Sequence, residues 1–328
     1  MNELKRMIND RFREIEKKAK RDECKLCHAK CTSFCNSHTI PKFILRRIAI
    51  DGHVDRGALK EHPLYDHAFG INNALTFKTI CDKCDNTRFQ TYESSKLYES
   101  EVSNELLQEI ALKNYLWMEA KRYKEKKLYE SIPNKNASVC DRLKICELDL
   151  HEYEKQILNW NKKEYTIIYD VTLEYEVPVS IQIPVCLITG IEKQIINNIY
   201  NKNPDYKTEE IHLCIFPLEN KTRILLFMDR THRRYRKFRK DFMKLSDKQK
   251  LYCINYMMLI YSEDWLISHK YLDKIVLNDE TKNVIQTTTD YFAFWFEDEK
   301  VNKLEIAIDK FLLKTEGDVF NFLEYKSH

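Results

Sequence analysis

Residues 24–27 read Cys-Lys-Leu-Cys, and residues 81–84 read Cys-Asp-Lys-Cys. A Cys-x-x-Cys turn presents two sulfurs side by side, and zinc is bound by four ligands, with thiolates among its preferred donors. Two such turns brought together by the fold would complete a four-cysteine site. The sequence therefore predicts a structural zinc ion (Zn²⁺) with the ligands Cys24, Cys27, Cys81 and Cys84.

Other interpretations of these cysteines stay open. The two turns could be unrelated, or one of them could be a redox pair. No strand–helix–strand pattern surrounds either turn, which disfavours a thioredoxin-like motif. Cys31 and Cys35 lie close to the first turn and could replace one of the four expected ligands.

Composition places the chain among globular proteins. Its 328 residues are 43% hydrophobic and 32% charged, with 5 glycines and 7 prolines, which excludes disordered, collagen-like and glycine-rich classes. Residues 1–18 are charged throughout, and the longest apolar stretch, 177–188, is interrupted by proline and polar residues. We therefore expect no membrane association and a cytoplasmic protein.

Hydrophobic spacing divides the chain near residues 95–100, where an irregular Cys- and His-rich region meets a long helical pattern. Helical spacing occurs at 2–22, 103–129, 139–163, 192–201, 231–244 and 246–262. Runs of β-branched and aromatic residues predict strands at 165–172, 176–189, 211–216 and 222–228. The expected class is α+β. Residues 1–98 would form a zinc module, and residues 99–328 a mixed helix and antiparallel-sheet domain for recognition, partner binding or regulation.

Four segments in order resemble the HNH nuclease family: CKLC at 24–27, SHTIP at 37–41, INNALTF at 71–77 and CDKCDN at 81–86. They are similar to uncharacterised bacterial HNH-like proteins with an SHxIPK motif. The resemblance covers less than a third of the chain, and each short segment alone is common. It implies a treble-clef zinc scaffold and a metal-dependent endonuclease that hydrolyses nucleic-acid phosphodiester bonds, with DNA favoured over RNA and RNA left open as a substrate. Some HNH proteins of this kind act in defence against phage.

The resemblance also implies residue roles. His38 would be the general base that takes a proton from the attacking water, because imidazole titrates near neutral pH. A Mg²⁺ or Mn²⁺ ion beside the scissile phosphate would be bound by Asp85, with Asn86 as the alternative ligand. Asn73, or its neighbour Asn72, would orient His38 or help to bind the ion.

One departure from the family bears on catalysis. The family usually has Asp, Glu or His directly before the catalytic histidine, as an ion ligand, and this chain has Ser37. The leading hypothesis is the HNH endonuclease, with Asp85 compensating for Ser37. The rival is a non-catalytic, zinc-dependent nucleic-acid-binding or scaffold protein. A toxin or defence effector that cuts only after activation is a third hypothesis.

A basic run at 230–244 suggests contact with nucleic-acid phosphates. It holds eight Lys or Arg residues and one acid, with aromatic residues at helical spacing. We expect phosphate contacts from Arg233, Arg234, Arg236, Lys237, Arg239 and Lys240. The alternative is an amphipathic helix whose cationic face is only solvated.

The remaining features point to ordinary structural roles. His53, His62 and His67 are expected to be surface-loop histidines. The aromatic run 291–296 is expected to be core. Exposed, it would instead suggest a protein partner or a homodimer formed through the C-terminal domain.

Overall fold

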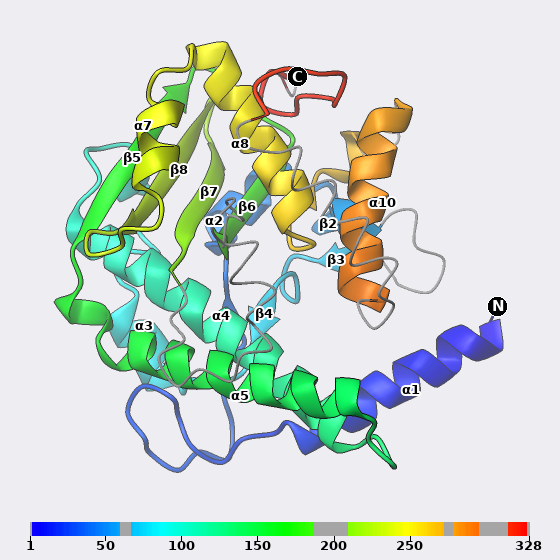
Figure 1. Cartoon of the computed structure of the whole chain (residues 1–328). Coiled ribbons are helices and arrows are strands. Elements are labelled where there is room, and N and C mark those ends of the chain that lie inside the picture. Colours follow the sequence, from blue (N-terminus) through cyan, green and yellow to red (C-terminus); the bar gives the residue numbers. More distant parts are fainter. Residues whose placement is uncertain (1, 60–66, 186–208, 272–277, 295–313, 327–328) are drawn as a thin grey trace.

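A computed structural model describes residues 2–59, 67–185, 209–271, 278–294 and 314–326 (Figure 1). The N-terminal half contains α1 (Asn2–Lys18), β1 (Ser37–His38), α2 (Lys42–Ile48), β2 (His53–Arg56), η1 (Gly57–Leu59), β3 (Ala68–Gly70), β4 (Thr76–Phe77), α3 (Asp82–Arg88), η2 (Ser95–Tyr98), α4 (Asn104–Glu130), α5 (Ala137–Leu158) and η3 (Trp160–Lys162). The C-terminal half contains β5 (Tyr165–Leu173), β6 (Val179–Val185), β7 (Ile211–Leu218), β8 (Lys221–Asp229), α7 (Arg236–Phe242), α8 (Asp247–Tyr261), β9 (Leu266–Ile267) and α10 (Asp279–Phe294).

A seven-stranded sheet organises the molecule, in the order β3-β2-β9-β6-β7-β8-β5. Its strand pairs are antiparallel, which confirms the mixed α+β class. The short strands β2 and β3 come from the zinc-module half, and β9 joins them to β6, with Asp55 opposite Ile267. The sheet therefore crosses the expected boundary between residues 98 and 99. The treble-clef assignment remains a prediction.

The sheet is buried on both faces because the side chains of β7 and β8 alternate between two apolar clusters. Leu213 and Ile215 pack in the cluster that contains α7 and α8. Cys214 and Phe216 pack in the other cluster, with α4, α2 and the cysteines Cys24 and Cys84. The cysteine-rich region therefore lies on one face of the sheet, together with α4 and α5, and α7 and α8 cover the other face (Figure 1).

The central helix α4 begins at a side-chain cap. The Ser103 hydroxyl accepts a hydrogen bond from the Leu106 N–H at 3.1 Å. Residues on every side of its middle turns are buried, including the charged Glu109, Lys113 and Glu119. A helix that is buried all round lies inside the fold rather than on its surface. Its polar side chains therefore require partners in the core.

A buried chain of polar groups joins α4 to the sheet and to the cysteine-rich region. The Asn114 amide contacts His212 Nδ1 at 3.0 Å and accepts from Gln182 Nε2 at 3.1 Å. Gln182 in turn accepts from the Tyr92 hydroxyl at 3.1 Å. All four side chains are buried, so these bonds fix the position of α4 against β6 and β7.

Most expected helices and strands are present near their predicted positions. The helix predicted at 231–244 is shorter, because Asp229 accepts two hydrogen bonds from Thr231 and holds a turn there. The predicted helix 192–201 lies outside the described residues. The aromatic run begins within α10, and its last two residues, 295–296, lie outside the described part. Within the described residues, no helix has the length and apolar character that a membrane crossing needs.

Candidate functional site

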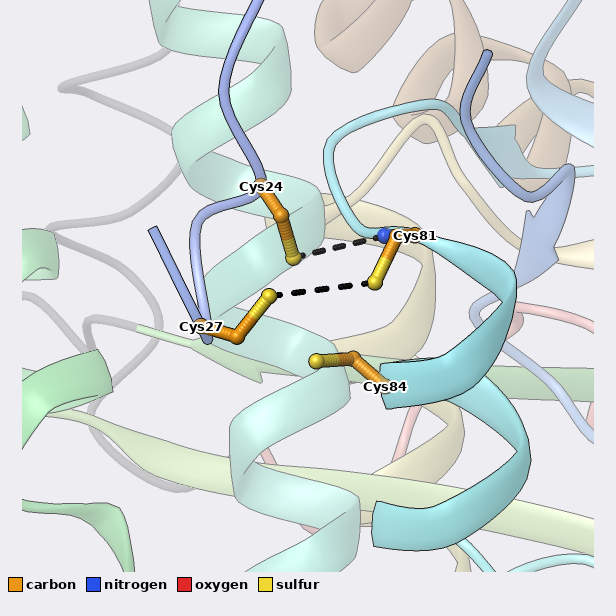
Figure 2. A group of neighbouring side chains, drawn as sticks. All are labelled: Cys24, Cys27, Cys81 and Cys84. Atoms are coloured by element: carbon orange, nitrogen blue, oxygen red, sulfur yellow. Dashed lines mark hydrogen bonds between the residues drawn. The ribbon is translucent and has the colours of Figure 1, made fainter. Parts of the chain in front are cut away.

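The four predicted zinc ligands converge on one point. One sulfur from each of Cys24, Cys27, Cys81 and Cys84 lies within 4.8 Å of the other three. Figure 2 shows the sulfurs pointing toward one another, two from the loop after α1 and two from the start of α3. Tetrahedral zinc with Zn–S bonds of ~2.3 Å places its sulfurs about 3.8 Å apart. The Cys27 and Cys81 sulfurs are 3.8 Å apart, so this group could hold a structural zinc ion.

Backbone N–H groups favour a thiolate at Cys24. Burial alone would raise the Cys24 pKa, but backbone hydrogen bonds from Cys27, Cys81 and Leu26 outweigh it and lower the pKa to about 7. The Cys81 N–H lies 3.3 Å from the Cys24 sulfur. Such hydrogen bonds at a sulfur are typical of thiolate zinc ligands.

The two other nearby cysteines point elsewhere. The Cys35 thiol donates to Asp85 Oδ2 at 3.2 Å, and burial together with that carboxylate raises its pKa to about 12. The Cys31 thiol donates to the Ala29 carbonyl at 3.3 Å. Neither belongs to the group of four, so the structure favours the ligand set expected from the two Cys-x-x-Cys turns.

His38 is oriented by a backbone carbonyl. It lies on β1, opposite Thr76 of β4, and its Nε2 is 2.8 Å from the Ile71 oxygen. A carbonyl only accepts, so Nε2 carries the proton and Nδ1 keeps a lone pair. Burial lowers the His38 pKa below its ordinary value, so the ring is neutral at neutral pH.

Asp85 lies beside the residue that precedes His38. Its Oδ1 accepts from the Ser37 hydroxyl at 2.7 Å and from the Lys113 ammonium at 2.8 Å. Lys113 also donates to the Ser37 hydroxyl at 2.7 Å, which closes a triangle of three side chains. Burial would raise the Asp85 pKa, but the charge and hydrogen bonds of Lys113, followed by Ser37, hold it below its usual value.

Lys113 is an internal cation. It projects from the middle of α4, and its side chain is only 1% exposed. Its ammonium lies 3.9 Å from the centre of the Phe89 ring and 5.3 Å from that of Tyr92. These aromatic faces and the Asp85 carboxylate together compensate for its loss of hydration. Lys113 is not among the site residues expected from the sequence; its only signal there is a place between apolar residues on every side of the middle turns of the helix.

The predicted asparagines lie at the surface. Asn73 and Asn86 are both exposed. Among the described residues, neither side chain makes a hydrogen bond to His38 or Asp85. The structure therefore brings His38, Ser37 and Asp85 into one region and leaves the roles of Asn73 and Asn86 as predictions.

One of the loop histidines has a buried partner that the sequence does not indicate. His53 is exposed, and His62 lies outside the described residues. His67 Nδ1 lies 2.9 Å from one oxygen of Asp55, and His269 Nδ1 lies 2.8 Å from the other. Asp55 is completely buried, so this contact ties β2 and the approach to β3 to the residues after β9.

The basic run surrounds a pocket rather than forming one flat surface. Of the six predicted phosphate-binding residues, Arg236, Arg239 and Lys240 line the pocket. Arg233 and Lys237 are exposed outside its lining, and the backbone N–H of Arg234 donates to Glu209 at 3.1 Å. The predicted residues therefore divide into a pocket-lining group and a peripheral group.

Comparison of the chain with protein-family models, with curated proteins and with solved structures finds no match. The resemblance to the HNH family therefore rests on the four sequence segments alone.

Proposed function

We propose that this chain is a zinc-stabilised nucleic-acid-binding protein built on an HNH-like module that does not use a divalent ion for catalysis. The observation that carries the proposal is the position of Lys113. Its ammonium bridges Ser37 and Asp85, the two positions at which the resemblance implies ligands to the ion. An internal cation thus stands where the Mg²⁺ or Mn²⁺ would be expected.

The donors around Asp85 fit a divalent ion poorly. Magnesium prefers near-octahedral oxygen coordination, often built from carboxylates, phosphates and water. Asp85 Oδ1 already accepts from Lys113 and Ser37, and Oδ2 accepts from Cys35. Ser37 supplies a neutral hydroxyl where the family has a stronger ligand. A divalent ion at this place would also be repelled by the buried ammonium.

The nucleic-acid part of the proposal is supported by charge. Segment 230–244 carries a local charge of +7 in a chain whose net charge is +3, so the remainder of the chain is net negative. Arg233, Lys237 and the pocket-lining Arg236, Arg239 and Lys240 have no ion-pair partner among the described residues. Unpaired surface cations of this density favour polyanionic partners, and their contribution to affinity falls as salt rises.

A second candidate function, the metal-dependent HNH endonuclease acting on DNA, is favoured by His38. Its Nε2 proton is held by the Ile71 carbonyl and its Nδ1 lone pair is unprotonated at neutral pH, which suits a general base. In that reaction Nδ1 would take a proton from water, the water oxygen would bond to phosphorus, and the P–O bond to the leaving oxygen would break. A defence role against phage belongs with this candidate.

Plasmid nicking and DNA binding by the same zinc-loaded protein distinguish the candidates. Supercoiled plasmid is incubated with Mg²⁺ or Mn²⁺ and wild type, His38→Ala or His53→Ala, the last being an exposed histidine nearby. If the binding proposal is right, the protein binds DNA with an affinity that falls steeply as the salt concentration rises. Wild type then nicks the plasmid no more than His38→Ala does. Nicking by wild type and His53→Ala that disappears in His38→Ala would establish the nuclease instead.

A further inference from the structure

A pocket of about 490 Å³ lies beside α7, at the β5 end of the sheet. Thr166 of β5 and Met228 of β8 are opposite one another in the sheet and both line it. Of the remaining lining residues, Arg230 and His232 follow β8. Arg236, Arg239 and Lys240 belong to α7, and Met243 follows it. Pockets that hold small ligands commonly measure about 300–1,000 Å³, so this one has room for a ligand of nucleotide size.

The shape of α7 places its cations at the pocket. Phe238 and Phe242 are buried and stack on each other, and Phe242 also contacts Tyr169 of β5 at 5.6 Å between ring centres. This apolar face fixes the helix on the sheet. Arg236 and Arg239 or Lys240 recur three or four residues apart, so they share the neighbouring face.

The charge of the pocket is one-sided. No acidic side chain is among its lining residues. Arg230 is paired with Glu164 at 2.5 Å, but Arg236, Arg239 and Lys240 have no carboxylate partner in the described part of the chain. Burial lowers the His232 pKa, so its ring contributes no charge at neutral pH. Three uncompensated cations around one cavity favour a ligand with two or more phosphate charges.

The rest of the lining is less polar. Met228 is buried and Met243 is largely exposed, and methionine thioethers adapt to flat aromatic groups. Thr166 adds a hydroxyl that can donate or accept. A bare phosphate would leave these three side chains without contacts. A phosphorylated nucleoside has a charged end for the arginines and an aromatic base for the methionines.

We propose that this pocket binds a phosphorylated nucleoside, with Arg236, Arg239 and Lys240 on the phosphates and Met228 and Met243 on the base. Two sources share this chemistry, a free nucleotide and the phosphorylated end of a nucleic-acid strand. The proposal is independent of whether the HNH-like module cuts, because none of these residues belongs to the His38 site.

The test is titration calorimetry of the full chain with ATP, pyrophosphate, adenosine and a short DNA strand with or without a 5′-phosphate. Arg236→Ala/Arg239→Ala removes two pocket cations. The control, Arg46→Ala/Lys248→Ala, removes one exposed arginine and one exposed lysine that lie outside segment 230–244 and do not line the pocket. Both double variants change the net charge equally, and their thermal unfolding is compared with wild type to verify folding.

We expect ATP to bind, pyrophosphate to bind more weakly and adenosine not to bind detectably. The pocket variant should weaken ATP binding by about tenfold or more, the loss expected for two charge-assisted hydrogen bonds, and the control variant should leave it nearly unchanged. The DNA strand could instead bind only with its 5′-phosphate, and lose affinity in the pocket variant but not in the control, while ATP does not bind. The natural ligand is then the phosphorylated end of a strand.

Three results would overturn the proposal. Equal weakening in both variants would mean a diffuse electrostatic surface. Pyrophosphate binding as tight as ATP binding would remove the role of the methionines and leave a simple anion site. Absence of binding by both ATP and the 5′-phosphorylated strand would show that the pocket takes no phosphorylated nucleoside.

Discussion

Lys113 Nζ lies 2.8 Å from Asp85 Oδ1, joining the centre of α4 to α3, the helix that begins within the second Cys-x-x-Cys turn. The Lys113 side chain is buried, with 1% of its surface exposed, and the Asp85 side chain is 20% exposed. Lys113 neutralises the carboxylate that the sequence predicts as an ion ligand. The same contact therefore supports the fold and argues against a divalent ion.

Breaking this pair should strongly destabilise the fold. Lys113→Met keeps the volume and leaves Asp85 with an uncompensated charge, for which a loss of about 3–5 kcal/mol is typical. The control is Lys124→Met on the same helix, whose partner Glu16 is 63% exposed. Exposed ion pairs contribute about 0–1 kcal/mol. Urea unfolding measures both, and equal losses would show that the buried pair contributes no more than a surface pair.

Zinc content should depend on four cysteines and not on a fifth. Cys27→Ser should lower bound zinc well below one ion per chain and lower the melting temperature, because structural zinc contributes directly to folding. Cys31→Ser should keep one zinc, since its thiol lies outside the group of four. Elemental analysis of the purified variants decides. If Cys31→Ser lost zinc and Cys27→Ser kept it, Cys31 would be the zinc ligand and Cys27 would not.

Stability should fall as the pH drops below 6.5, partly because of His212. Burial lowers the pKa of this fully buried ring to about 3, whereas the unfolded chain has the ordinary value. The unfolded state therefore binds a proton that the folded state does not, so stability is present above pH 6.5 and is lost between 6.5 and 3. One such proton costs about 1.4 kcal/mol per pH unit.

The measurement is the slope of unfolding free energy against pH between 7 and 5.5, in wild type and in His212→Gln. Removing the imidazole should make the slope shallower by up to about 1.4 kcal/mol per pH unit, the value for one bound proton. This change in slope is expected whatever the effect of the substitution on absolute stability. An unchanged slope would mean that His212 takes up a proton in the folded state as readily as in the unfolded chain.

Gly57 should be intolerant of any side chain. A Cβ placed there would lie 1.9 Å from the ring of Trp265, which is buried just before β9. Gly57→Ala should therefore displace Trp265 and cost about 1–3 kcal/mol, as overpacking usually does. Gly70→Ala is the control, because the nearest atom to its Cβ is 4.0 Å away. Thermal melting should show a clear loss for the first variant only.

The sequence predicts local features better than long-range ones. The four-cysteine group follows from spacing, and the helices capped by Ser103 and Ser246 begin near the starts that their spacing predicts, since capping depends on neighbouring residues. The pairing of β2 with β9 has no such local signal, because β9 has two residues and lies far along the chain. The apolar residues around Lys113 in α4 indicate that it is buried. Its partner Asp85 lies 28 residues away in the sequence, so only the folded structure identifies the pair.

Manganese binding by zinc-loaded protein tests the central claim most directly. Electron paramagnetic resonance titration measures bound Mn²⁺ in wild type, in Asp85→Asn, in Lys113→Ala and in Lys113→Ala/Asp85→Asn. If the ammonium takes the place of the ion, wild type has no Mn²⁺ site that depends on Asp85. Lys113→Ala should gain one, and the added Asp85→Asn should remove it. A wild-type Mn²⁺ site that is lost in Asp85→Asn alone would contradict the account and restore the metal-dependent nuclease.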